Sequence, residues 1–532
     1  MLFRLNWGMG DYIVYKKVFS ILLAVFFIAI AGFHFTLNFS KRAEPPSYKW
    51  AKEVLISSGN LQSNPSLIKF KDNYIVVHSD SDKIKVISID NNGKKLKEKT
   101  LNVNAPEPLS TSVVTDGKEI IVYWTIIEEG KRNVYSQRLD ERLNALQQSR
   151  IDGTMEIASI GDNISAFSYI DKVIVEDFNT GKSFSVQANE PQLISGAKNK
   201  NSYVLSFKEK GGKVKYFDIT NDKVSKVKTA GEVPEVTSIV YTGASLTVDE
   251  DFAYLMIEYR NKGEFGETKL MRFSLKEEGN FELDDFKVNN SKVGLSNVVT
   301  YANKEGEAKF LAIKSVPYDK KDSYKNIVEY NFTNPTGFVN VSRTKELSMY
   351  PAAVDDVAVF CDVVGKDKFN VYMTSSSEQF IKTHNNLRNS EIKLALMDTI
   401  SGILFSFAYI LPYGALWVLP SIGVIFLYSI FEFKLSPIKK KRGFAIVYIA
   451  YFIFKVAGVK LISFERFAHY LPEFMTFGLS FVISLIISLL CGVYAYLKYS
   501  SGIEDNVGAT SLFIPIVWDT VLSLMFVVPF IV

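Results

Sequence analysis

The stretch "SLIKFKDNYIVVHSDSDKIKVISIDNNGKKLKEKTL", residues 66–101, decides the expected fold of most of this chain. A short apolar segment leads through a turn into the β-branched run "YIVV", and lysines then alternate with isoleucine and valine over residues 83–89. That alternation is typical of a strand with one buried face. "NNGK" at 91–94 places Gly93 where a tight hairpin requires a positive φ. The stretch therefore predicts antiparallel strands joined by hairpin turns.

The same order of strands and turns recurs along the chain. Glycine again occupies the expected turn in "DGK" (116–118), "EEGK" (128–131) and "NTGK" (179–182). Successive copies are about 40–50 residues apart, which is the length of one four-stranded β-propeller blade. The seven copies occupy residues 66–101, 111–144, 163–186, 202–227, 251–283, 308–332 and 351–376.

On these repeats, residues 50–385 resemble the generic β-propeller superfamily. The resemblance implies that about seven blades close into a ring, with "EVLISS" at 53–58 pairing with the last blade and clasping it. The Trp-Asp ending of WD40-like repeats is absent, and no consistent kelch or quinoprotein motif occurs. The resemblance therefore implies a fold and no ligand. A pair of β-sandwiches or a β-helix is the structural alternative.

Composition narrows the class of protein. The 61 basic residues nearly balance the 57 acidic ones, for a net charge of +4, which argues against a nucleic-acid partner. Cys361 lies in the polar middle and Cys491 in an apolar run, so no disulfide framework is expected. Abundant lysine, asparagine and isoleucine indicate a bacterial protein. Because both ends are apolar, the expected class is a multidomain membrane protein, with the propeller between an N-terminal transmembrane helix and a C-terminal α-helical membrane domain.

The first apolar segment, residues 18–39, has no charged residue and is long enough to cross a bilayer. We expect it to be an uncleaved transmembrane anchor, preceded by a cytoplasmic segment at residues 1–17. The alternative is a signal peptide cleaved after Ala31, because "AIA" at 29–31 resembles a cleavage site.

The C-terminal membrane domain, residues 386–532, is predicted to contain about four spans. The first apolar block is interrupted by Pro412 and Pro420. It is long enough to cross twice, or to cross once after an interfacial helix. The four blocks are 394–431, 444–464, 473–497 and 510–532.

The basic run Lys439, Lys440, Lys441 and Arg442 is the expected topology determinant. Short cytoplasmic loops of membrane proteins carry an excess of lysine and arginine, so the loop that holds this run is predicted to be cytoplasmic. If residues 394–431 cross once, the propeller lies outside; if they cross twice, it lies inside. We expect a single crossing, in a multi-pass protein of the cell membrane.

Two ionisable residues lie in the middle of predicted spans. Lys455 is in the second block and Asp519 is in the fourth. A charge at that depth is costly and usually faces a partner. With a single crossing, the two residues differ in depth by roughly 3 Å at 1.5 Å per residue. We therefore expect an intramembrane charge pair, which either fixes helix packing or marks a proton or substrate path.

No catalytic, cofactor-binding or metal-binding residue is predicted, because none of the four histidines has the spacing of a metal motif. We expect a non-enzymatic protein whose extracytoplasmic propeller is a binding or scaffold module. One alternative is a subunit of a membrane transport or envelope-export complex. Another is an extracytoplasmic hydrolase or lyase. The expected partners are the lipid bilayer and other membrane or envelope proteins, and the sequence indicates no ligand.

Overall fold

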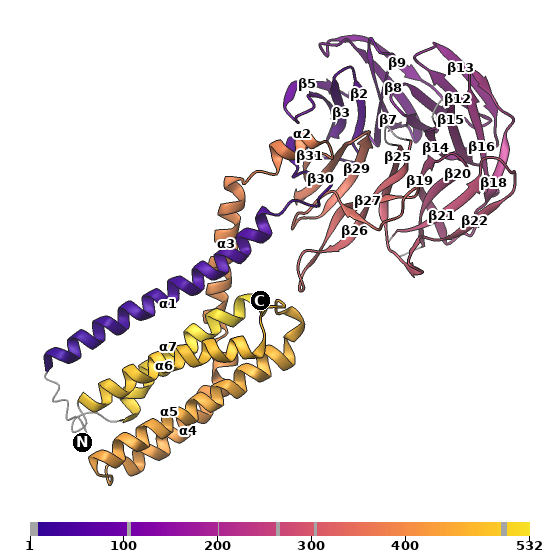
Figure 1. The fold of residues 1–532 in the computed structure, drawn as a ribbon. Coiled ribbons are helices and arrows are strands. Elements are labelled where there is room, and N and C mark those ends of the chain that lie inside the picture. Colours follow the sequence, from indigo (N-terminus) through magenta and orange to yellow (C-terminus); the bar gives the residue numbers. More distant parts are fainter. Residues whose placement is uncertain are drawn as a thin grey trace. The chain divides into compact units, whose positions relative to one another are not determined.

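The computed structural model describes residues 9–103, 108–199, 202–261, 266–302, 306–501 and 508–531. The chain divides into two compact units, which Figure 1 colours along the sequence. The helical unit comprises Met1–Glu44, Asp319–Asp322 and Leu387–Val532, and the β unit comprises Pro45–Tyr318 and Ser323–Asn386.

The β unit is a seven-bladed β-propeller, as the repeats predict. Each blade is an antiparallel sheet of strands that follow one another in the chain, except that the seventh blade also takes in the first strand of the chain. Blades one to three contain β2 (Ser66–Phe70), β3 (Asn73–Asp80), β4 (Lys83–Ile89), β5 (Lys95–Asn102), β6 (Ser110–Thr115), β7 (Ile120–Glu128), β8 (Lys131–Leu139), β9 (Ala145–Ile151), β10 (Glu156–Ile160), β11 (Ile164–Ser168), β12 (Lys172–Asp177) and β13 (Lys182–Gln187).

The remaining four blades complete the ring. Blades four and five contain β14 (Gln192–Asn199), β15 (Ser202–Lys208), β16 (Lys213–Thr220), β17 (Lys223–Val224), β18 (Lys228–Glu232), β19 (Ile239–Val248), β20 (Phe252–Asn261), β21 (Glu267–Ser274) and β22 (Phe281–Asp285). A small hairpin, β23 (Lys287–Val288) and β24 (Ser291–Lys292), precedes blade six. Blades six and seven contain β25 (Ser296–Ala302), β26 (Ala308–Pro317), β27 (Ser323–Asn331), β28 (Val339–Asn340), β29 (Ser348–Val354), β30 (Val357–Gly365) and β31 (Lys368–Ser375), and α2 (Glu378–His384) follows.

Neighbouring blades cover both faces of each sheet, and this explains the burial of the middle strands. β3 is buried at six consecutive positions, whereas the outermost strand β5 is exposed at nearly every position. The cluster between blades one and two includes Ile75, Val122 and Trp124. The core of the propeller therefore lies between blades, and each blade contributes to two clusters.

Strand β1 (Val54–Gly59) closes the ring by pairing with β31 of blade seven, which confirms the predicted clasp. Ile56 on this strand is 3% exposed, in the cluster that blades seven and one share. The hydroxyl of Ser57 lies 3.0 Å from Nε2 of His78, on β3 of blade one. One strand thus completes the sheet of the last blade and also contacts the first blade.

The hairpin turns follow the glycine pattern of the sequence. Gly93, Gly117, Gly130 and Gly181 have φ angles of +78°, +82°, +75° and +69°. Glycine adopts this backbone region without the steric cost that a Cβ would add. The prediction of tight turns at these four glycines is confirmed.

The repeats do not begin at the same strand of every blade. The copies that start at residues 163, 202, 251 and 308 begin with the second strand, so β10, β14, β19 and β25 lie outside them. Several of these first strands are irregular: Leu193 on β14 and Asn297 on β25 have φ of 55° and 48°, at breaks in strand register. A bulge interrupts the alternation of apolar and polar residues, and the sequence pattern therefore misses these strands.

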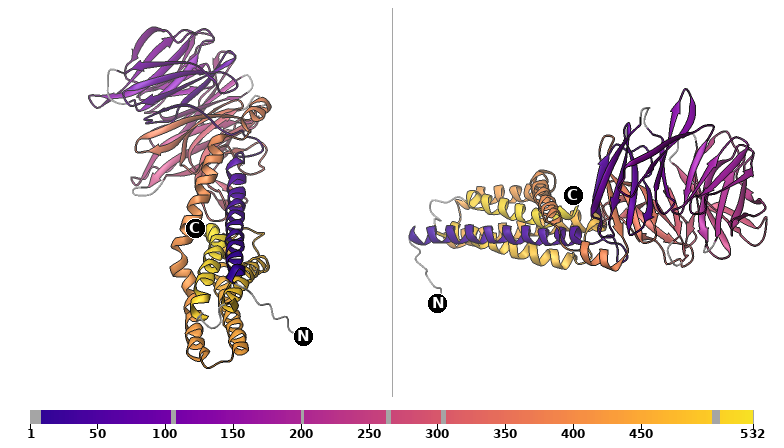
Figure 2. Two further views of the ribbon diagram at one scale, coloured as in Figure 1. Left: turned by 90° about the vertical axis from the view of Figure 1, so that its left-hand side faces the viewer. Right: turned by 90° about the horizontal axis from the view of Figure 1, so that it is seen from above.

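In the helical unit, α1 and α4–α7 lie side by side in both views of Figure 2. The helices are α1 (Met9–Ala43), α3 (Asn389–Ala408), α4 (Ala415–Glu432), α5 (Pro437–Val459), α6 (Phe477–Ser501) and α7 (Gly508–Ile531), with π-helical turns at Ile410–Gly414 and Lys460–Arg466 and a 3₁₀ turn at Ala468–Tyr470. Five helical segments of the described chain are long and apolar enough to cross a membrane: Lys17–Ala43, Ile410–Glu432, Pro437–Arg466, Phe477–Ser500 and Gly508–Ile531.

The block predicted at 394–431 contains α3 and α4. Pro412 lies in the π-helical turn and Pro420 lies inside α4, and the chain remains helical through both. The chain therefore does not reverse at either proline. Among the described residues of this block, the segment long and apolar enough to cross a membrane is Ile410–Glu432.

The basic run lies in a helix, and its predicted place in a loop is wrong. α5 begins at Pro437 after the N-cap residue Ser436, so Lys439 to Arg442 belong to its first turns. Proline favours the first helical position, where its fixed φ suits the helix and its missing N–H is not needed. Residues 1–8, 502–507 and Val532, at the edges of predicted segments, lie outside the described residues.

Replacing Ile56 by alanine should weaken ring closure. Removing a buried isoleucine side chain costs about 2–5 kcal/mol of unfolding free energy. The neighbouring Leu55 is 56% exposed, so Leu55→Ala should change stability by less than about 0.5 kcal/mol. Thermal unfolding of the detergent-solubilised full chain compares the two variants. Equal effects of the two would contradict the role of Ile56 in the clasp.

Candidate functional site

The interior of the helical unit holds a buried ion pair. Nζ of Lys455, on α5, lies 2.5 Å from Oδ1 of Asp519, on α7, and both side chains are fully buried. The ammonium also donates to the hydroxyl of Ser488 at 2.8 Å and to the carbonyl of Ser484 at 3.2 Å, both on α6. Ser488 donates to Oδ2 of Asp519 at 2.7 Å. The structure thus brings together the two residues singled out from the sequence and connects them to a third helix.

Protein atoms satisfy both charges. An ammonium has three N–H donors, and those of Lys455 are matched by Asp519, Ser488 and Ser484. Both oxygens of Asp519 accept hydrogen bonds. A buried charge whose partner is removed is strongly destabilising, because its desolvation is then uncompensated. The cluster therefore ties α5, α6 and α7 into one arrangement.

Aromatic hydroxyls and an indole extend this cluster. The hydroxyl of Tyr448 donates to the carbonyl of Ser488 at 2.9 Å. At the next residue of α7, Nε1 of Trp417 donates to Oγ1 of Thr520 at 3.2 Å, and the hydroxyl of Tyr451 lies 3.4 Å from the same oxygen. Helix α4 is thereby connected to the same polar interior.

Two glycines admit these rings between the helices. A Cβ on Gly458 would lie 2.6 Å from the ring of Trp417, and a Cβ on Gly492 would lie 2.5 Å from the ring of Tyr448. Such distances are too short for any side chain. The close approach of α4 to α5, and of α5 to α6, therefore depends on glycine at both positions.

A second polar cluster lies at the end of the helical unit where α5 begins. Glu432 on α4 is 2% exposed and accepts hydrogen bonds from the hydroxyl of Tyr499 at 2.5 Å and from the N–H of Gly508 at 3.0 Å. Gly508 begins α7, and free N–H groups at a helix start favour a carboxylate. The hydroxyl of Tyr428 donates to the carbonyl of Lys440 at 2.9 Å. The four basic residues 439–442 lie at this same end of the helical unit, and Lys439 and Arg442 are exposed.

Sequence reasoning missed Ser488 and Glu432. A signal for the serine was present: Ser480, Ser484 and Ser488 recur at intervals of four on α6, and all three are buried. Residues four apart lie on one face of a helix, so this spacing marks a polar face inside an apolar span. Glu432 gives no such periodic signal, because it is a single acid at the end of an apolar run.

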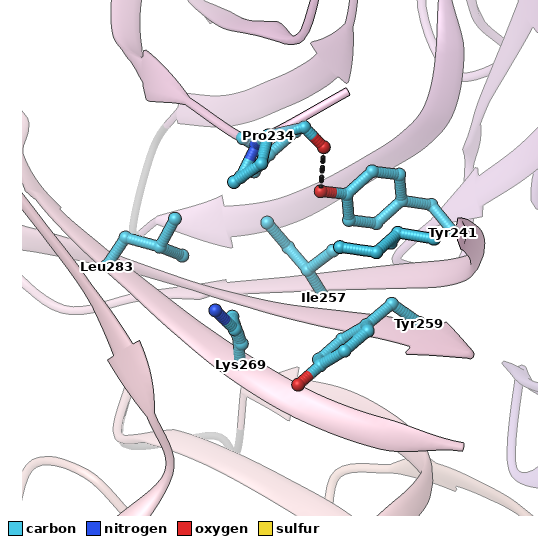
Figure 3. Close-up of a pocket in the computed structure, with 8 residues that line it drawn as sticks. Pro234, Tyr241, Ile257, Tyr259, Lys269 and Leu283 are labelled. Carbon is cyan, nitrogen blue, oxygen red and sulfur yellow. Dashed lines mark hydrogen bonds between the residues drawn. The ribbon is translucent and has the colours of Figure 1, made fainter. Parts of the chain in front are cut away.

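In the propeller, a small pocket between the segment after β18 and the sheet of blade five is shown in Figure 3. The hydroxyl of Tyr241 donates to the carbonyl of Pro234 at 2.6 Å, and Ile257, Tyr259 and Leu283 form the other walls. The cavity measures about 20 Å³, which is room for about one water. It is a packing void and is too small for a ligand.

A larger and more polar groove of about 380 Å³ lies between blades two and three. Nη1 of Arg138 lies 3.0 Å from Glu119 on one wall. Glu176 faces them from blade three, where burial raises the pKa of its carboxyl group and the charge of Arg138 lowers it. Tyr123 completes the wall. The groove combines donors, acceptors and an aromatic ring, as small-ligand sites do.

Ser57 and His78 are placed like a nucleophile and its base, but both are enclosed. The exposed fractions are 9% for Ser57 and 0% for His78. The second nitrogen of His78 lies 2.8 Å from the carbonyl of Ser79. Burial lowers the pKa of the His78 imidazole. The pair is sealed between blades one and seven, where it holds the clasp strand.

Asp362 on β30 is an acid inside the propeller. Its side chain is 2% exposed, and the hydroxyl of Ser348 donates to Oδ1 at 2.7 Å. Burial raises the pKa of Asp362 to about 7, although the hydrogen bond from Ser348 lowers it. The group therefore titrates near neutral pH, whereas an exposed aspartate titrates near pH 4.

No family model and no curated protein matches this sequence. Similar solved structures include the N-terminal domain of Nup159, at 10% identity and a TM-score of 0.37, where the match covers 62% of this chain and 98% of that one. A Pyrococcus horikoshii acylaminoacyl peptidase matches at 11% identity and a TM-score of 0.35, over 59% of this chain and 50% of that one. A prolyl endopeptidase matches at 12% identity and a TM-score of 0.38, over 63% of this chain and 49% of that one. At such values, none of these likenesses transfers an activity or a partner.

Breaking the ion pair on one side should destabilise the helical unit. Lys455→Met leaves Asp519 buried without its counter-charge, and Asp519→Leu does the reverse, so each should cost about 3–5 kcal/mol. The double variant K455M/D519L removes both charges, and Ser488 can turn to the carbonyl of Ser484. The double variant should therefore unfold close to wild type. Thermal unfolding in detergent measures all three, and harmless single changes would contradict the pairing.

Asp362→Asn should make the protein more stable at pH 8 and leave it nearly unchanged below about pH 4. The pKa of Asp362 is higher in the folded than in the unfolded chain, so the native state binds more protons between pH 4 and 7. Its stability falls as pH rises through that window, by up to about 4 kcal/mol at 1.36 kcal/mol per pKa unit. Unfolding midpoints across pH test this. The exposed Asp72→Asn is the control, and parallel profiles for the two variants would contradict the assignment.

Proposed function

We propose that this chain is a non-enzymatic multi-pass membrane protein whose propeller is an extracytoplasmic binding or scaffold module. The observation that carries the membrane assignment is the inside-out composition of the helical unit. Leu419, Phe426 and Ile446 on its surface are 64%, 65% and 65% exposed. Lys455 and Asp519 are buried in its interior. Water would favour the opposite distribution, whereas lipid favours this one.

The directions of the helices support a propeller outside and the basic run inside. The ring of Phe19, early in α1, stacks on Tyr494 near the end of α6 at 3.7 Å, and Phe33, late in α1, lies 5.8 Å from Phe526 near the end of α7. α1 therefore runs with α7 and against α6. Both connections to the propeller, after α1 and before α3, leave the bundle at the end opposite residues 439–442. An excess of positive charge on the cytoplasmic side would then support a propeller outside.

The second candidate function is that of a subunit in a membrane transport or export complex, which requires a partner protein in the membrane. Helix α3 carries exposed apolar side chains, with Leu396, Met397 and Leu404 at 49%, 54% and 62%. That surface is suited to another apolar helix or to lipid. A stoichiometric membrane protein that co-purifies in mild detergent would favour this candidate, and its loss on Leu404→Gln would assign the surface.

The proposed topology predicts opposite labelling of two variants that each carry one introduced cysteine. Lys131→Cys lies at the exposed start of β8 and Lys439→Cys lies at the start of α5. A membrane-impermeant maleimide should label the first in intact cells and the second only after permeabilisation. The native Cys361 and Cys491 are buried and give little background. The reverse pattern would overturn the topology.

A further inference from the structure

A lateral groove of about 370 Å³ runs between α5 and α6. From α5 it is lined by Phe444, Ala445, Tyr448, Ile449 and Phe452, and from α6 by Leu485, Ser488, Leu489, Gly492, Val493, Tyr496 and Leu497. Ile449, Leu489 and Val493 are each 57% exposed, so the groove is open along its side. In a membrane, that side faces lipid.

Two polar residues at the inner end of the groove, Ser488 and Tyr448, direct their hydrogen-bonding groups away from an occupant. Ser488 donates its hydroxyl to Asp519, and Tyr448 donates to the carbonyl of Ser488. What remains for an occupant is nearly all hydrocarbon. A ligand with a hydroxyl or carbonyl at this depth would find little to bind, whereas a saturated chain meets a matching surface.

The length of the groove matches one leaflet of a bilayer. From Leu485 to Leu497 the groove spans about 18 Å along α6 at 1.5 Å per residue. Half of a bilayer's hydrocarbon core is about 15 Å. The groove extends from the level of the ion pair to the end of the bundle where α5 begins.

Positive charge lies at that end of the groove. Lys441 is four residues before Ala445 and seven before Tyr448, so it lies on the groove face of α5. Arg442, the next residue, is three residues before Ala445 and seven before Ile449, so it lies at the edge of the same face. Basic residues beside grooves between transmembrane helices attract anionic lipid headgroups. Lys439 lies on the face of Ile446, away from the groove.

We infer that the groove between α5 and α6 binds one anionic phospholipid, with an acyl chain along Phe444–Phe452 and the phosphate beside Lys441 and Arg442. This inference rests on the proposed membrane insertion. The apolar lining of the groove matches the acyl chain, and the two basic residues match the negative charge of the headgroup. The bound acyl chain covers Tyr448 and the groove wall in front of the buried Ser488, and so keeps water from the ion pair.

Native mass spectrometry of the full chain with phosphatidylglycerol or phosphatidylcholine tests the inference. Wild type should retain phosphatidylglycerol in preference. The variant K441Q/R442Q should bind it about fivefold more weakly for each charge removed, at ~1 kcal/mol per basic residue. The matched variant K434Q/K439Q removes two charges at the same end and should change affinity less than twofold. Equal retention of both lipids by wild type, or equal losses in both variants, would overturn the proposal.

A pair of tryptophan substitutions tests whether the acyl chain of the lipid lies in the groove. Ile449→Trp fills the groove and should abolish lipid retention, whereas Ile446→Trp, on a face 65% exposed, should leave it intact. A change in oligomeric state with Ile449→Trp and no change in bound lipid would assign the groove to a second copy and overturn the proposal. Loss of the wild-type chain from carbonate-washed membranes would instead refute the membrane assignment itself.

Discussion

The pairing of β1 with β31 is the interaction on which the architecture depends. It closes the ring, and it also brings the entry and the exit of the propeller together: the carbonyl of Ala51 accepts from Thr374 at 2.7 Å, and the N–H of Lys52 donates to Asn385 at 2.9 Å. Without this strand, blade seven would end in a free edge. The chain could then not leave the propeller beside the point where it entered. A domain inserted between two helices of another unit requires that arrangement.

A second constraint acts in the helical unit, where polar groups can be placed only if other protein groups satisfy them. Both polar clusters meet this requirement, at different levels of the helical unit. One does so through Lys455, Asp519 and Ser488, and the other through Glu432, Tyr499 and the start of α7. Each cluster joins at least three helices. Such interactions contribute little net stability over apolar packing, but they select one arrangement of helices whose outer surfaces are otherwise alike.

Local chemistry decided which features could be predicted from the sequence. Turn glycines such as Gly93 and charges inside apolar segments, such as Lys455, are conspicuous because few other structural roles explain these residue types at such positions. The first strands of several blades were missed, since a bulge at residues such as Asn297 destroys the alternation. The basic run was predicted to lie in a loop on the basis of its charge alone. The Ser-Pro pair before it, which favours the start of a helix, was not taken into account. Glu432 depends on the helix that comes to face it, and no local pattern carries that information.

All the hydrogen-bonding groups of the ion pair have protein partners, and this favours one of the two roles expected for it. A proton or substrate path requires a group that can exchange partners, with water or a vacant acceptor beside it. Lys455 has three donors and three protein acceptors, and the hydroxyl of Ser488 bridges the ammonium and the carboxylate. The groove that approaches this cluster meets the hydroxyl-bearing side chains and not the charges themselves. The geometry therefore favours a static junction of α5, α6 and α7, in keeping with the binding or scaffold role proposed for the chain.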